Sequence, residues 1–262
     1  MTAYSFDHLA IAAPDWSPAG PWLASVLGGR WGHGARMPHM DVCQLHFGND
    51  TRLELLSPGS SPDSFVRRFL EQAGGRPRPH HLTFKVTDIK RTLDAAVEHG
   101  IEPILVNLEH DVWKEAFLHP RDTGLGFLVQ FVESAIDPTT VESDAHVPAP
   151  WSDRVDGRPA DVDFVLARVP GLTTQRPVLR DILGGREEEL DAPGGRRIVR
   201  FSWSRGADVI LVTGTDPADG FGVRSIGVRP GESLDLPLSP LGPGYRETGR
   251  LDLLGLSLIV SP

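Results

Sequence analysis

The fold is decided by the stretch PHHLTFKV, which spans residues 79–86. In an extended strand, successive side chains point to opposite faces. Leu82 and Phe84 therefore fall on one face, and His81 and Thr83 fall on the other. The apolar face can build a hydrophobic core, while the polar face presents an imidazole for chemistry. We interpret this stretch as a strand that contributes to both a core and a site.

Three other stretches alternate in the same way. In each of them, one polar residue stands on the face opposite the large apolar residues. The stretches are FDHLAIAA (6–13), RLELL (52–56) and GFLVQFV (126–132), and their polar residues are His8, Glu54 and Gln130. Four predicted strands thus each contribute one polar group to what can be a single surface.

The order of the predicted elements repeats along the first half of the chain. His8 and His81 are 73 residues apart, and Glu54 and Gln130 are 76 residues apart. Nearly equal separations indicate an internal repeat. Each histidine strand is followed by one predicted helix and three predicted strands. The helices are expected near 22–27 and 89–97, and the strands near 30–35, 42–47 and 52–56, then near 101–106, 113–118 and 126–132.

The second half of the chain carries weaker copies of this unit. VLRDILGGR (178–186) parallels WLASVLGGR (22–30), and the same offset of 156 residues maps His8 onto Phe164 and Glu54 onto Ile210. A fourth unit is predicted from 223 to 260, with Ser225 and Ile259 at the corresponding positions. Its stretch 230–244 is rich in Pro and Gly where a helix is expected, so this unit is degenerate.

Composition narrows the function to small-molecule chemistry. The 262 residues carry a net charge of −9, with no basic cluster, so we expect neither nucleic acid nor a membrane surface as a partner. The single cysteine, Cys43, excludes an internal disulfide. No secretory leader pattern and no apolar run long enough to span a bilayer occurs, and we expect a cytoplasmic protein.

The four polar residues suit a divalent metal ion. His8 and His81 offer imidazoles, Glu54 a carboxylate and Gln130 an amide oxygen. Such a set can bind Mn, Co, Ni, Zn or Fe(II) and leave positions for water or substrate. Each residue alone has an ordinary structural explanation, but four equivalent positions on repeated strands favour a shared site.

Other polar residues carry weaker signals. Gln44 and His46 share one strand face and can line the same cavity, whereas His80 points away from His81 and is expected to be structural. Three charged residues, Lys85, Lys114 and Glu115, are usable for substrate charge or proton transfer, but exposed charge pairs are the commoner explanation for such residues.

The sequence resembles the vicinal-oxygen-chelate superfamily, and within it most closely the methylmalonyl-CoA epimerase and glyoxalase families. The resemblance covers residues 4–134 and rests on four stretches: FDHLAIA (6–12), TRLELLSP (51–58), PHHLTFKVTDI (79–89) and AFLHP (116–120) through GFLVQ (126–130). It implies paired β-α-β-β-β units that form a half-open barrel. It also implies a metal held in the concavity by His8, Glu54, His81 and Gln130.

Two departures from the epimerase pattern bear on mechanism. The resemblance implies that epimerases use glutamates on the strands that match Gln130 and Gln44, whereas both residues are glutamine here. An amide cannot act as a general base near neutral pH. The candidate catalytic residues are therefore Glu54, Gln130 and Gln44, with Glu54 or a metal-bound hydroxide in the role of base.

We predict an α+β chain of tandem β-α-β-β-β units in two lobes. Residues 1–134 form a metal-binding glyoxalase-like lobe of two units, 135–160 a linker, and 161–262 a degenerate glyoxalase-like lobe. The second lobe is expected to bind no metal and to pack on the first as a fused pseudo-partner. Whether the protein forms a homodimer is left open.

The preferred function is a metal-dependent isomerase or lyase that acts through an enolate-like intermediate on a carbonyl or acyl-CoA substrate. Two histidines and one carboxylate also suit an Fe(II)-dependent dioxygenase. The third alternative is a non-catalytic, antibiotic-sequestering protein that binds a small molecule, because a fold does not fix a function.

Overall fold

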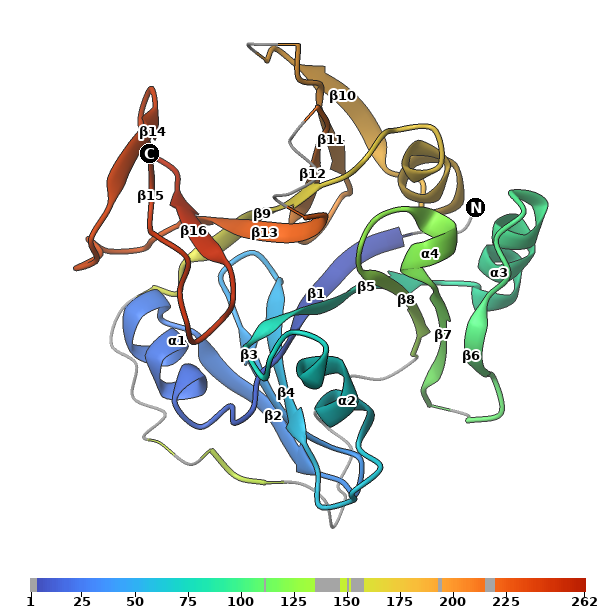
Figure 1. Cartoon of the computed structure of the whole chain (residues 1–262), viewed down its shortest axis with the longest axis horizontal. Coiled ribbons are helices and arrows are strands. Elements are labelled where there is room, and N and C mark those ends of the chain that lie inside the picture. Colours follow the sequence, from blue (N-terminus) through green and yellow to red (C-terminus); the bar gives the residue numbers. More distant parts are fainter. Residues whose placement is uncertain are drawn as a thin grey trace. The chain divides into compact units, whose positions relative to one another are not determined.

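The computed structural model of the protein describes residues 4–110, 112–134, 147–149, 151, 158–192, 195–214 and 220–262 (Figure 1). The predicted linker 135–160 therefore lies mostly outside the described residues. In the part of the chain that the structure describes, no helix is long and apolar enough to cross a membrane.

The first sheet has eight strands in the order β2-β3-β4-β1-β5-β8-β7-β6. Two successive β-α-β-β-β units build it, and a short helix, α2, connects them. The elements are β1 (Tyr4–Ala12), α1 (Ala19–Leu27), β2 (Arg30–Arg36), β3 (Met40–His46), β4 (Arg52–Pro58), α2 (Phe65–Glu71), β5 (Arg78–Val86), α3 (Ile89–Glu98), β6 (Ile104–Asn107), β7 (Lys114–Leu118), α4 (Pro120–Thr123) and β8 (Leu128–Glu133).

The second sheet follows the same plan, in the order β10-β11-β12-β9-β13-β16-β15-β14. Its elements are β9 (Asp161–Arg168), the π-helical η2 (Pro177–Ile182), β10 (Arg186–Leu190), β11 (Ile198–Ser202), β12 (Asp208–Val212), β13 (Gly222–Arg229), β14 (Ser239–Gly242), β15 (Tyr245–Glu247) and β16 (Ser257–Val260). Residues 230–238, all described, contain no helix, so the fourth unit lacks its helix, as the Pro and Gly content predicts. The predicted fold class of tandem units is confirmed.

The chain divides into two compact units that do not follow the sheets. Unit 1 comprises residues 1–7, 81–138 and 164–224, and unit 2 comprises residues 8–80, 139–163 and 225–262. The boundary passes through β1 between Asp7 and His8, and through β5 between His80 and His81. Each sheet falls within one predicted lobe, whereas each unit takes strands from both sheets, so the division into two lobes stays a prediction.

Aromatic side chains form the centre of unit 1. The rings of Phe6 and Phe84 meet edge to face with centroids 5.5 Å apart, and Phe84 lies 4.8 Å from the ring of Trp203. Phe6 and Phe84 are almost completely buried. This packing uses the apolar face of β5, which the alternation in residues 79–86 predicts.

In unit 2, both faces of β1 are buried. Leu9 and Ile11 belong to the hydrophobic core on one face. On the other face, Ala10 and Ala12 pack in a cluster with Val66 and Leu70 of α2, as well as Val42, Leu56, Met37, Met40 and Phe69. The small alanine side chains allow this close approach. Helix α2 therefore covers part of the strand face that carries His8.

Candidate metal centre

His8 and Glu54 meet on neighbouring strands of unit 2. Strand β1 runs parallel to β4, and Ala10 is the register partner of Glu54, which places His8 one step along the same face. Nε2 of His8 lies 3.6 Å from Oε2 of Glu54, and the side chains are only 3% and 15% exposed. The pair offers one nitrogen and one oxygen donor in a shielded setting.

Gln44 holds the other oxygen of Glu54. The two residues are directly paired across the antiparallel strands β3 and β4. Nε2 of Gln44 donates a long hydrogen bond of 3.5 Å to Oε1 of Glu54. An ionised carboxylate only accepts hydrogen bonds, so Gln44 must turn its amide nitrogen toward it. Gln44 thus orients the carboxylate, which has His8 at Oε2 and Gln44 at Oε1.

His81 begins the part of β5 that belongs to unit 1. Its side chain is buried, with 5% exposure. The ring of Phe117 on β7 meets the imidazole edge to face, with centroids 5.8 Å apart. Phe117 and His81 therefore lie on the same side of these strands, and the aromatic contact restricts the rotation of the imidazole.

Gln130 is engaged at both ends of its amide. The hydroxyl of Thr83 donates to Oε1 of Gln130 at 2.6 Å, and Nε2 of Gln130 donates to Oε2 of Glu115 at 2.8 Å. Gln130 is 6% exposed. Its register partner is Thr83, which lies two residues beyond His81 on β5, so Gln130 shares the face of His81.

The three strongest candidate ligands come together. Each of His8, Glu54 and His81 contributes one ligand atom, and these atoms all lie within 4.8 Å of one another. Two imidazole nitrogens and one carboxylate oxygen at this spacing fit a divalent ion of the first transition series. The donor set therefore suits a divalent metal centre.

Two neighbours of these residues have structural roles. Burial, with a smaller effect of the Glu54 charge, raises the pKa of the Cys43 thiol, so this thiol stays protonated and unreactive. His80 packs edge to face on Phe69, with ring centroids 4.6 Å apart. Burial lowers the pKa of His80 to about 4, despite the opposing charge of Glu54. His80 is therefore neutral at physiological pH.

The equivalent positions of the second sheet are filled by other residues. Phe164 pairs with Asp208 in the same register in which His8 pairs with Arg52, so Phe164 and Ile210 match His8 and Glu54. Ser225, at the position of His81, shares a 2.8 Å hydrogen bond with the hydroxyl of Ser257. None of these equivalent positions carries an imidazole or a carboxylate. Of the two sheets, the first therefore has the candidate metal ligands at these positions, and the second does not.

Glu115 is a residue beside the candidate site to which the sequence analysis gave too little weight. Lys114 does form a charge pair, with Nζ 2.6 Å from Oε1 of Glu133. Glu115 instead accepts hydrogen bonds from Gln130 and, at 3.1 Å, from the indole Nε1 of Trp113. It is half-buried, in contrast to the expected exposed charge. The signal in the sequence was its spacing of two residues from Phe117, which places both on one strand face.

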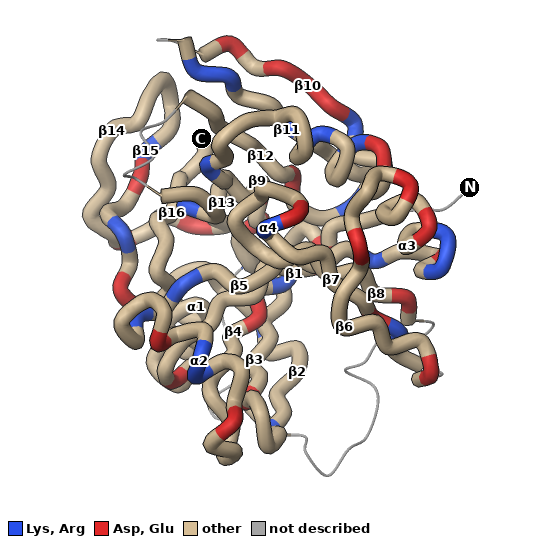
Figure 2. Tube along the Cα trace, turned by 45° about the vertical axis from the view of Figure 1, so that its right-hand side comes forward, with Lys and Arg blue, Asp and Glu red and all other residues tan. Residues whose placement is uncertain are grey.

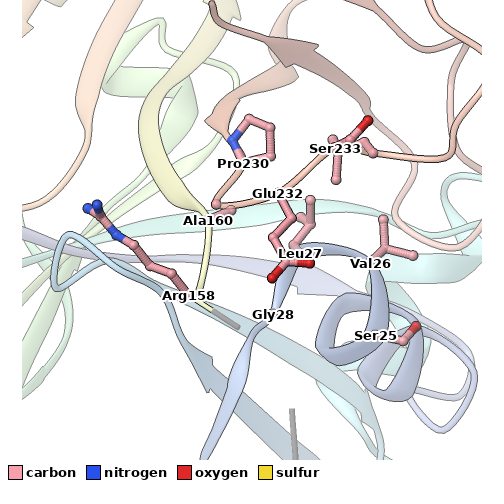
Figure 3. Close-up of a pocket in the computed structure, with 11 residues that line it drawn as sticks. Ser25, Val26, Leu27, Gly28, Arg158, Ala160, Pro230, Glu232 and Ser233 are labelled. Carbon is pink, nitrogen blue, oxygen red and sulfur yellow. The ribbon is translucent and has the colours of Figure 1, made fainter. Parts of the chain in front are cut away.

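A separate small cavity lies at the C-terminal end of α1 (Figure 3). It holds about 100 Å³ and is lined in part by Ser25, Gly28, Arg158 and Glu232. Arg158 is itself ion-paired with Asp161, Nη2 lying 3.4 Å from Oδ2. None of the predicted site residues lines this cavity, so it is unrelated to the candidate metal centre.

Tandem β-α-β-β-β units with histidines on one strand face define a protein of the vicinal-oxygen-chelate fold. Residues 7–117 match the glyoxalase/bleomycin resistance protein/dioxygenase superfamily. Human mitochondrial methylmalonyl-CoA epimerase is 32% identical over 138 residues, which cover 49% of this chain and 73% of that protein. The bovine mitochondrial enzyme is 32% identical over 136 residues, with the same coverage. The chain belongs to the glyoxalase/bleomycin resistance protein/dioxygenase superfamily.

A solved structure matches over a longer part of the chain. A mutant of 4-hydroxymandelate synthase from Streptomyces coelicolor superposes with a TM-score of 0.61 and covers 87% of this chain and 71% of that chain. The sequence identity is 17%. This likeness extends the shared fold beyond the first sheet and shows the fold alone.

Proposed function

We propose that this protein is a metal-dependent isomerase or lyase that removes a proton next to a carbonyl, with an acyl-CoA thioester as the preferred substrate class. The observation that carries the proposal is the set of His8, Glu54 and His81, whose ligand atoms lie within 4.8 Å of one another. The identity of 32% with methylmalonyl-CoA epimerase supports the substrate class.

In this proposal, His8, Glu54 and His81 hold a divalent ion, with Gln130 as a weaker fourth ligand. Such an ion polarises a carbonyl and stabilises an enolate when substrate is bound. The metal is Co, Ni, Mn, Zn or Fe, all of which accept imidazole and carboxylate ligands. Both histidines are buried, so their imidazoles lie away from bulk water.

Glu54 is the proposed proton acceptor, once its carboxylate is displaced from the metal. Gln44 and Gln130 stand where the resemblance to epimerases places glutamates, and an amide cannot take a proton near neutral pH. Gln44 secures Oε1 of Glu54 by a hydrogen bond and leaves Oε2 on the side of His8. The two glutamines then orient groups and bind substrate, while the carboxylate moves the proton.

Deuterium exchange tests this proposal directly. The purified protein, loaded in turn with each candidate metal, is incubated in D2O with methylmalonyl-CoA and a panel of other acyl-CoA thioesters. We expect exchange at the carbon next to the thioester, detected by mass spectrometry, and its loss on chelation and in Glu54→Ala. Stoichiometric metal binding without exchange on any thioester would contradict the proposed chemistry.

Fe(II)-dependent oxygenation is a second candidate function, and the His8, Glu54 and His81 set favours it because two histidines and one carboxylate suit Fe(II) and oxygen. One experiment separates oxygenation from the isomerase or lyase function. The protein is loaded with Fe(II) under anaerobic conditions, and oxygen uptake is then measured with an oxygen electrode in the presence of aromatic and aliphatic keto acids. Oxygen uptake coupled to substrate loss supports oxygenation, and exchange without uptake supports the preferred function. Cytoplasmic location, homodimer formation and the role of the second lobe stay predictions.

A further inference from the structure

Glu115 lies on the strand face that carries the candidate metal ligands of unit 1. Along β7, Ala116 and Leu118 are buried in the core. Glu115 and Phe117 alternate with them and occupy the opposite face. Phe117 touches the imidazole of His81, and Glu115 accepts a hydrogen bond from Gln130. The carboxylate therefore sits beside Gln130, on the side of β7 that faces His81.

The carboxylate determines which way the amide of Gln130 points. In the observed orientation, Nε2 donates to Glu115 and Oε1 accepts from Thr83. A flipped amide would put its oxygen against the Glu115 carboxylate, and two acceptors at that distance repel each other. A hydroxyl such as that of Thr83 can donate or accept, whereas an ionised carboxylate only accepts. The Glu115 carboxylate therefore disfavours the flipped orientation.

Glu115 is itself held in place. The indole Nε1 of Trp113 donates to the same oxygen, Oε2, that accepts from Gln130. Charge-assisted hydrogen bonds of this kind are stronger than those between neutral groups. The series Trp113, Glu115, Gln130 and Thr83 is a connected network that ends at the strand of His81.

We infer that Glu115 is a positioning residue that selects the oxygen atom of Gln130, rather than its nitrogen, for the metal centre. An amide coordinates a divalent cation only through its oxygen. That oxygen has two lone pairs, of which one accepts from Thr83 and one is left for a ligand. This inference rests on the proposed function, since it assigns Gln130 as the fourth ligand.

Metal affinity measured on the full-length protein tests the inference. Isothermal titration with CoCl2 or MnCl2 alone gives the dissociation constant for the wild-type protein and for Glu115→Ala, Glu115→Gln and Glu115→Lys. We expect Glu115→Ala to weaken binding by about 10- to 100-fold, as is common for a residue that orients a ligand. Glu115→Gln keeps an acceptor for Gln130 and should stay close to wild type. Glu115→Lys replaces the acceptor with a donor, so the amide of Gln130 should turn its oxygen toward the lysine and away from Thr83. We expect this variant to bind the metal most weakly.

Two controls separate orientation from a general loss of structure. Trp113→Phe removes the other hydrogen bond to Glu115 and should weaken binding less than Glu115→Ala. Glu102→Ala removes an exposed carboxylate before β6 and should leave affinity unchanged. Thermal unfolding of each metal-free variant is measured in parallel, and lower affinity without a matching drop in unfolding temperature supports positioning.

The outcomes distinguish this inference from the proposed function. If the wild-type protein binds the metal and Glu115→Ala binds it with the same affinity, the inference is overturned and the proposed metal centre still stands. Equal losses in Glu115→Ala and Glu115→Gln also overturn it, because the charge and not the amide orientation would then matter. A wild-type protein that binds no divalent metal overturns the proposed function, and the inference with it.

Discussion

Nε2 of His8 lies 3.6 Å from Oε2 of Glu54, although 46 positions separate the two residues in the sequence. The parallel pairing of β1 with β4 creates this proximity, because it sets Ala10 beside Glu54. Gln44 occupies the other oxygen of the carboxylate. A carboxylate with an imidazole on one oxygen and an amide on the other is the best-defined part of the candidate centre.

Glu54 variants should separate metal binding from proton transfer. Glu54→Gln keeps an oxygen donor of the same length, so we expect a metal still to bind, with the deuterium exchange lost. Glu54→Ala removes the donor and should weaken binding by more than about 100-fold, beyond the usual effect of a residue outside the ligand set. Titration calorimetry and the exchange assay check both variants. Full exchange activity in Glu54→Gln would rule out Glu54 as the base.

The adjacent histidines should have opposite phenotypes. His81→Ala removes a proposed ligand and should abolish stoichiometric metal binding, measured by elemental analysis after reloading. His80→Ala removes a buried ring that packs on Phe69 and should lower the free energy of unfolding by about 2 kcal/mol, with metal binding kept. Urea denaturation gives the second value. Loss of metal in His80→Ala, with the protein folded, would contradict the assigned roles.

His80 should make the stability of the metal-free protein depend on pH. Burial lowers its pKa from 6.5 to about 4, so the unfolded state binds the proton more readily than the folded state. Its contribution to stability is complete above pH 6.5 and is lost as the pH falls toward 4, on the order of 3 kcal/mol in total. Urea denaturation between pH 4 and 7.5 measures the loss.

The matched control for this pH dependence is His80→Phe. It keeps an aromatic ring against Phe69 and removes the titration. The wild type should therefore lose more stability than His80→Phe between pH 6.5 and 4, and the other histidines affect both proteins equally. Parallel curves for the two proteins would show that His80 does not titrate as its burial requires.

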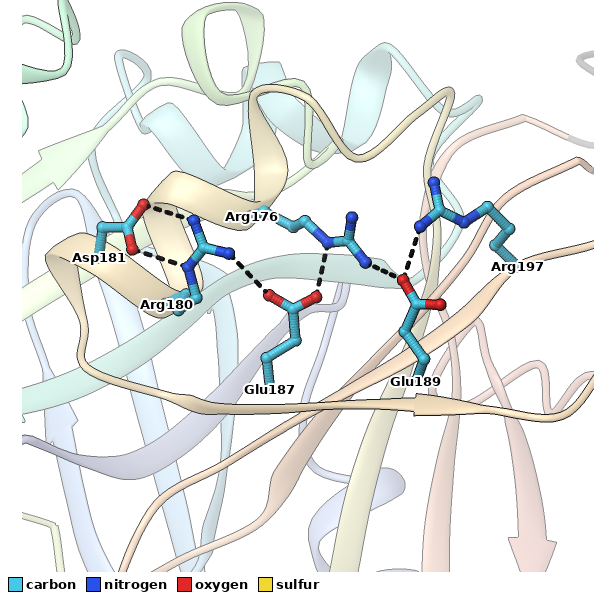
Figure 4. Close-up of polar contacts among 6 residues, drawn as sticks. All are labelled: Arg176, Arg180, Asp181, Glu187, Glu189 and Arg197. Carbon is cyan, nitrogen blue, oxygen red and sulfur yellow. Dashed lines mark hydrogen bonds and ion pairs between the residues drawn. The ribbon is translucent and has the colours of Figure 1, made fainter.

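A ladder of ion pairs joins η2, and Arg176 just before it, to β10 and to Arg197 just before β11, within unit 1 (Figure 4). β10 carries three consecutive glutamates, 187–189, and is marked by acidic residues in Figure 2. Glu187 contacts Arg176 at 2.7 Å and Arg180 at 3.3 Å, while Glu189 pairs with Arg176 and with Arg197. Hydrogen bonds from Arg176 and Arg197 lower the pKa of Glu189.

Glu187 should matter more than Glu189 in this ladder. The Glu187 side chain is 17% exposed and that of Glu189 is 59% exposed, so water screens Glu187 less. We expect Glu187→Gln to lower the free energy of unfolding by about 1 kcal/mol and Glu189→Gln by less. Both losses should shrink in 1 M NaCl. Equal losses that do not respond to salt would show that the ladder is not electrostatic in origin.

The sequence by itself determined which residues lie opposite the apolar face of each strand. Alternation along a strand is a local property of the backbone, so His8, Glu54, His81 and Gln130 could be assigned to one face without knowledge of their neighbours. The repeat of elements also followed from local patterns, and it predicted the tandem β-α-β-β-β fold. The Pro and Gly content of residues 230–244 predicted a unit without its helix.

Only the tertiary structure decided which side chains meet. Glu115 has Val132 as its register partner and reaches Gln130 diagonally, a contact set by strand register and side-chain length. The cover of α2 on Ala10 and Ala12 likewise depends on packing between distant segments. Strand register and the packing of a connecting helix arise from many weak contacts summed over the fold, and no short stretch of sequence encodes them. The assignment of residues to the two faces of each strand thus followed from the local sequence, whereas the hydrogen-bond network around Gln130 depended on the tertiary structure.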